Sequence, residues 1–166
     1  MNEYLEKYGT NKNYKLLSVI IGIITTFALM SELSFENNVG DGGYITISNF
    51  SSTMDSIRHQ GSVLKMYMIV LLILTTIALV IAINKIMKKQ NTISYIIGVI
   101  IFGISEYSIL TGGFKVVDAY TNGSNLSSDA LESGATFLAS MWFVVIIYAI
   151  YELITLLIRK KSKKNS

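Results

Sequence analysis

Apolar residues along this chain occur in four long runs, each bounded by charged or polar segments. A helix of about 20 apolar residues crosses the hydrocarbon core of a bilayer, and about 17–25 are tolerated. Two of the runs are broken by a single carboxylate, Glu106 in the third and Glu152 in the fourth. The pattern predicts four transmembrane helices in one domain, residues 1–166, with spans at approximately 14–33, 64–84, 91–112 and 134–158.

The runs are rich in β-branched Ile, Val and Thr, which favour strands in water. In lipid an open strand leaves backbone groups unpaired, so a helix is the stable form. A transmembrane barrel is disfavoured, because its strands are about 10 residues long and alternate polar with apolar positions, and these runs do not alternate. The predicted fold is an all-α integral membrane protein, an antiparallel bundle of four transmembrane helices with a small extracellular cap.

The first run also fits a signal peptide, because lysines precede about 15 apolar residues. The cleavage site is poor, since Ala28-Leu29-Met30 places methionine where a small residue is needed. A retained first helix is therefore the favoured interpretation.

Basic residues are distributed unevenly over the connections. Eleven of the fourteen Lys and Arg residues lie in the N-terminal segment, in the turn between the second and third runs, or in the C-terminal tail. The two longer connections, 34–63 and 113–133, lie on the other side and are rich in acids. The positive-inside rule then predicts a multi-pass protein of the plasma membrane with both termini in the cytoplasm.

Residues typical of turns separate short expected elements within each of the two outer loops. In the first loop, residues 44–50 alternate like a strand and suggest a short β-hairpin, and residues 51–60 suggest a short helix that lies on the membrane or runs into the second span. In the second loop, Gly112-Gly113 is expected to break the chain. Asp129 with Glu132 three residues later resembles a capping box, which marks a helix start.

No catalytic or metal-binding pattern is visible. The chain has no cysteine, so thiol catalysis and zinc–thiolate sites are excluded. It has one histidine, His59, which is too few for a histidine-based metal site within one chain. Asp55 and His59 have the spacing of a surface pair on a helix but lack a nucleophile. We expect no enzyme activity, no cofactor and no metal.

The basic balance of the chain, with a pI near 9.0, could suggest nucleic acid. The basic residues are not interleaved with aromatic or polar readers, so we expect no nucleic-acid partner. The tail residues Arg159, Lys160 and Lys161 come directly after the fourth span and are expected to face anionic lipid.

The two carboxylates within the runs lie at different predicted depths. At a rise of 1.5 Å per residue, Glu106 lies about 22 Å from the cytoplasmic start of its span, in the outer third of the membrane. Glu152 lies near the cytoplasmic edge, where a structural role or snorkelling to the interface explains it. The two are therefore about 17 Å apart along the membrane normal, which rules out a catalytic dyad.

Glu106 is the stronger functional candidate, because intramembrane acids usually face a partner helix or an ion path. Gly103 lies on the same face and permits close helix approach, while Ser105 and Tyr107 add hydroxyl groups nearby. Three explanations stay open for Glu106. It could bond to a neighbouring helix, hold a proton or cation, or contact the span of a partner protein. Ser94 and Gly98 form a further small-residue pair that allows close packing.

These observations favour a binding protein over a channel, because a channel needs a continuous polar stripe. We expect an accessory subunit or an immunity-type protein that binds a membrane or secreted partner through its outer loops and the Glu106 face. The alternative is an oligomeric channel or ion-coupled transporter that uses Glu106. Richness in Asn, Lys and Ile indicates an AT-rich genome and favours a bacterial membrane.

Overall fold

The computed structural model describes residues 9–39, 50–90, 93–122 and 128–164, and side chains within 9–30, 61–90, 93–118 and 136–164. All secondary-structure elements in these ranges are helical, and none is a strand. In chain order they are α2 (Lys12–Val39), α3 (Phe50–Met87), α4 (Ile93–Ser108), the π-helix η2 (Ile109–Gly113), α5 (Phe114–Asn122) and α6 (Ser128–Lys164).

Four helices are long and apolar enough to cross a membrane, as the sequence predicts. The qualifying segments are Lys12–Met30, Gly61–Met87, Ile93–Asp118 and Thr136–Lys164. Large apolar side chains on these segments point outward; Ile147 is 65% exposed and Val80 is 61% exposed. Soluble monomers rarely expose apolar surface on this scale, so the outer surface of the bundle suits a lipid solvent.

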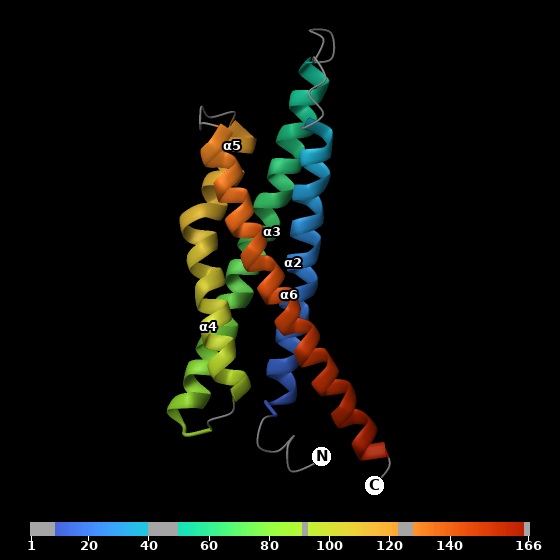
Figure 1. Cartoon of the computed structure of the whole chain (residues 1–166), viewed down its shortest axis with the longest axis vertical. Coiled ribbons are helices and arrows are strands. Elements are labelled where there is room, and N and C mark those ends of the chain that lie inside the picture. The colour runs from blue at the N-terminus through green and yellow to red at the C-terminus, as the bar shows by residue number, and fades with distance from the viewer. Residues whose placement is uncertain (1–8, 40–49, 91–92, 123–127, 165–166) are drawn as a thin grey trace.

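Figure 1 shows α2 beginning and α6 ending at the same end of the molecule, where the turn between α3 and α4 also lies. We call this end the terminal end and the opposite one the loop end. Helix α2 packs against α3 and α6, and α4 packs against α3 and α6. The core between the helices holds bulky buried side chains, among them Ile21, Met68, Phe102 and Trp142.

The long helices α3 and α6 contain 38 and 37 residues, which is about 55 Å each at a rise of 1.5 Å per residue. The expected helix at residues 51–60 is therefore the start of α3 and runs into the second span without a break. The helix start marked by Asp129 and Glu132 is also confirmed, because α6 begins at Ser128. The expected hairpin at residues 44–50 lies almost entirely outside the described residues.

The predicted break at Gly112-Gly113 is wrong. Residues 109–113 form the π-helix η2, and α5 continues the same helical path to Asn122. Gly113 is packed closely, since a Cβ added there would lie 3.1 Å from Met68 Cε and 3.5 Å from Leu138 Cδ1. A π-helix keeps the backbone hydrogen-bonded through the two glycines, which apolar surroundings demand.

The start of α2 and the end of α3 show defined capping. At the start of α2, Asn11 Oδ1 accepts a hydrogen bond of 2.9 Å from the Asn13 backbone N–H, an N-cap. At the end of α3, Gln90 N donates to Lys85 O at 3.0 Å and Lys89 N donates to Ile86 O at 2.9 Å. This is a Schellman motif, and Lys89 occupies its left-handed position with φ of 58°.

Candidate functional site

A buried ion pair joins the first and last helices at the terminal end. Lys15 Nζ on α2 lies 3.0 Å from Glu152 Oε2 on α6, and their side chains are 1% and 0% exposed. Lys15 Nζ also donates to the hydroxyl of Thr155. Burying a charge costs several kcal/mol unless it is paired and hydrogen-bonded. Each of these two charges is therefore tolerated because of the other.

Hydroxyl groups complete the surroundings of Glu152. Tyr148 Oη lies 2.8 Å from Glu152 Oε1 and also 2.8 Å from the carbonyl oxygen of Ser94 on α4, and its single proton can go to either. Thr10 Oγ1 and Thr155 Oγ1 each lie 3.5 Å from Glu152 Oε2. Tyr148 therefore connects α6 with α4, and the Glu152 carboxylate connects α6 with α2 through Lys15.

A close approach of two tyrosines to α4 adds to this connection. A Cβ added at Gly98 would lie 2.0 Å from Tyr14 Oη and 3.3 Å from Tyr148 Oη, so only glycine fits there. The rings of Tyr14 and Tyr95 have centroids 5.0 Å apart. The small-residue pair Ser94 and Gly98 thus allows close packing, as expected, but its neighbours are tyrosine side chains from α2 and α6.

The segment preceding α2 is held against the same cluster. Arg159 Nη1 donates to the Thr10 carbonyl at 2.9 Å, and the Asn11 backbone N–H donates to Tyr95 Oη at 3.0 Å. Thr10 is only 2% exposed. We call Thr10, Tyr14, Lys15, Tyr95, Tyr148, Glu152, Thr155 and Arg159 the terminal polar cluster; it fixes α2, α4 and α6 to one another.

Sequence reasoning expected Glu152 to be structural or to snorkel, and the snorkelling alternative is wrong, because Glu152 points into the bundle. From the sequence alone, its partner Lys15 is one of the basic residues that set the topology. The signal that could have found the cluster is the spacing of Tyr148, Glu152, Thr155 and Arg159, which places four polar residues on one face of an otherwise apolar helix. Pairing with Lys15, by contrast, is visible only in three dimensions.

Glu106 occupies a different environment, on the side of the bundle between α3 and α4. Thr76 Oγ1 on α3 lies 2.6 Å from Glu106 Oε1 and 2.8 Å from its own Leu72 carbonyl. The single hydroxyl proton of Thr76 can be donated to either of these two acceptors. Within the described residues, Glu106 Oε2 has no hydrogen-bond partner.

The residues that the sequence groups with Glu106 point in different directions. Gly103 faces α3, with Leu79 Cδ2 3.9 Å from an added Cβ, and Tyr107 projects outward, 65% exposed. Ser105 is 1% exposed and lies in the interior, so it is not part of the surface around Glu106. We call Gly103, Glu106, Tyr107 and Thr76 the Glu106 face.

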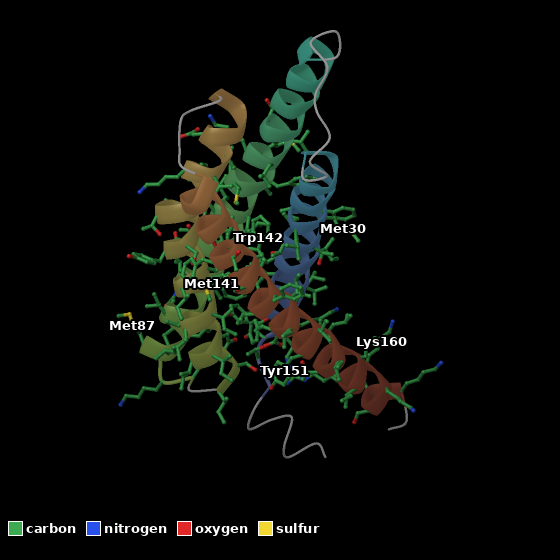
Figure 2. The ribbon with its side chains drawn as sticks, turned by 45° about the horizontal axis from the view of Figure 1, so that its top comes forward. Met30, Met87, Met141, Trp142, Tyr151 and Lys160 are labelled. Carbon is green, nitrogen blue, oxygen red and sulfur yellow. The ribbon has the colours of Figure 1, made fainter. Side chains whose placement is uncertain are left out.

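The three basic residues at the end of α6, Arg159, Lys160 and Lys161, lie in different environments. Arg159 Nη1 donates to the Thr10 carbonyl, and its expected contact with anionic lipid stays a prediction. Lys160 and Lys161 are exposed, and Figure 2 shows Lys160 on the outer side of the last turns of α6.

The terminal polar cluster and the Glu106 face contribute carboxylate, amine, guanidinium and hydroxyl groups. Glu106 and Glu152 share no partner in the described ranges. No group of three or more His, Cys, Asp or Glu side chains that could hold a metal occurs among the residues whose placement is described. Comparisons with known protein families, with curated proteins and with solved structures find no match to this chain.

Proposed function

We propose that this chain is a non-enzymatic, four-span protein of a bacterial plasma membrane that binds the transmembrane helix of a partner protein, as an accessory subunit or an immunity-type protein. The helices form an antiparallel bundle with both termini in the cytoplasm, so the terminal end is the cytoplasmic end. The Glu106 face supplies the contact within the membrane, and the connections at the loop end add contacts outside it.

The observation that carries the proposal is a carboxyl group on the side of the bundle with an unused oxygen. An acid in a membrane is costly, and it normally faces the bundle interior. Here the acid in the interior is Glu152. Glu106 is only partly buried, and its Oε1 accepts a hydrogen bond from Thr76 on the neighbouring helix α3. A partner helix that presents a hydroxyl, amide or basic side chain would satisfy Glu106 Oε2 and cover Tyr107.

The same geometry speaks against an ion path through a single copy of the chain, because Glu106 is turned away from the core. The alternative function, an oligomeric channel or ion-coupled transporter, would require several copies to bring their Glu106 faces together around a common axis. This alternative predicts a homo-oligomer and ion flux that depends on Glu106.

Site-specific photo-crosslinking in membranes tests the proposal. A photo-reactive amino acid at Tyr107 is compared with one at Ile147 on α6, since both side chains are 65% exposed. The Tyr107 probe should give a discrete adduct with a foreign membrane protein, and Glu106→Gln should abolish it. Ser140→Ala, which removes an exposed hydroxyl elsewhere in a span, is the matched control and should leave the adduct unchanged.

Two results would overturn the proposal. Equal adducts from Tyr107 and Ile147 would mean random collisions in the membrane. An adduct whose mass is that of a second copy would favour the channel alternative, which ion flux into liposomes with wild type and Glu106→Gln would then decide.

A further inference from the structure

The last turns of α6 carry four lysines that have no acidic partner. Lys160, Lys161, Lys163 and Lys164 are all exposed, and none forms a salt bridge within the part of the chain that the structure describes. Like charges three or four residues apart on a helix repel one another. The cluster therefore gains stability from any anion that lies between its side chains.

Three of these lysines, Lys160, Lys161 and Lys164, continue an exposed apolar surface of α6. Leu153, Ile154 and Leu157 are 41%, 50% and 58% exposed. Lys160 and Lys161 follow Leu157 by three and four residues, and Lys164 follows it by seven, so they share its face. Arg159 takes the opposite direction, because it is drawn inward to the Thr10 carbonyl. The helix thus presents an apolar stripe that ends in amines.

An amphiphile with a negative head matches this order of groups. Its acyl chain would lie along Leu153, Ile154 and Leu157, and its phosphate would lie among the amines at the level of the headgroups. Long lysine side chains extend readily to that level, and each lysine near an anionic surface contributes about 1 kcal/mol. A soluble protein partner would have no use for the apolar stripe.

We infer that the end of α6 is a binding site for an anionic phospholipid, with Lys160, Lys161 and Lys164 holding the headgroup and Leu153, Ile154 and Leu157 holding the acyl chain. The inference rests on the proposed insertion in a membrane but not on the partner of Glu106. Either can therefore fail without the other.

Native mass spectrometry of the full chain in detergent tests the site, with phosphatidylglycerol and phosphatidylcholine as probes. The variant K160Q/K161Q/K164Q is compared with K85Q/K88Q/K89Q, which removes the same charge from the end of α3 and the turn that follows it. We expect wild type to prefer phosphatidylglycerol. The α6 variant should bind it at least about tenfold more weakly, and the control variant should change by less than about twofold.

Three outcomes would overturn the inference. Equal affinity for the two lipids would show that the headgroup charge is not recognised. Equal losses of phosphatidylglycerol affinity in the two variants would show that the positive charge at this end attracts the lipid without a defined site. Competition by glycerol phosphate in excess would show that a free phosphate suffices and that the apolar stripe contributes nothing. Circular dichroism of both variants establishes that they are folded, and a double variant, K161Q/K164Q, replaces the α6 variant if it is not.

Discussion

Lys15 Nζ and Glu152 Oε2 lie 3.0 Å apart in the interior of the helix bundle, although the two residues are far apart in the sequence, on α2 and α6. Each would be an uncompensated charge without the other. The pair therefore forms only when α2 docks against α6. The pair stabilises the packing of α2 against α6, and any arrangement that separates the two helices leaves two buried charges unpaired.

A double-mutant cycle on this pair should show strong coupling. Lys15→Met or Glu152→Leu alone leaves one buried charge unpaired, and we expect each to lower the free energy of unfolding by about 3–5 kcal/mol. The double variant should lose much less than the sum, because it contains neither charge. Reversible unfolding in mixed micelles measures the four free energies. Additive losses would mean that the two groups do not interact energetically.

Substitution of Gly22 should separate α2 from α6. A Cβ added at Gly22 would lie 2.2 Å from Ala149 Cβ, which belongs to a residue fixed on the facing helix. We expect Gly22→Ala to destabilise the protein by about 1–3 kcal/mol through overpacking. Gly112→Ala is the control, since nothing lies within 4 Å of a Cβ there. The combination with Ala149→Gly should recover part of the loss, and thermal unfolding of all four proteins checks this.

Replacement of Lys89 by glycine should stabilise the turn after α3. Lys89 has φ of 58°, the left-handed conformation that costs an L-residue about 1–2 kcal/mol and glycine almost nothing. We expect Lys89→Gly to raise the midpoint of thermal unfolding, by an amount equivalent to about 1 kcal/mol. Lys88→Gly should not, because Lys88 does not have a positive φ. Equal effects at the two positions would show that the gain has another origin.

The proposed orientation is accessible to cysteine labelling, because the chain has no cysteine of its own. A membrane-impermeant maleimide added to intact cells should label Ser48→Cys and Ser124→Cys and should fail to label Gln90→Cys until the membrane is permeabilised. The reverse pattern would invert the topology. Labelling of all three positions in intact cells would point to a different number of crossings.

The sequence by itself determined the number of long apolar helices, because each run satisfies the length of a span with its own residues and its own backbone hydrogen bonds. It also located the starts of α3 and α6, whose signals are local. It did not determine the continuity of the third helix. Gly112-Gly113 has the composition of a break, but packing against Met68 and Leu138 keeps these residues helical.

Only the tertiary structure decided what the two carboxylates do. Hydropathy treats Glu106 and Glu152 alike, as single charges in apolar runs, and their predicted depths make Glu106 the stronger functional candidate. The direction of a side chain depends on how its helix is rotated against its neighbours, which is set by contacts between residues far apart in sequence. That rotation turns Glu152 inward to Lys15 and Tyr148, and it leaves Glu106 at the side of the bundle with Thr76.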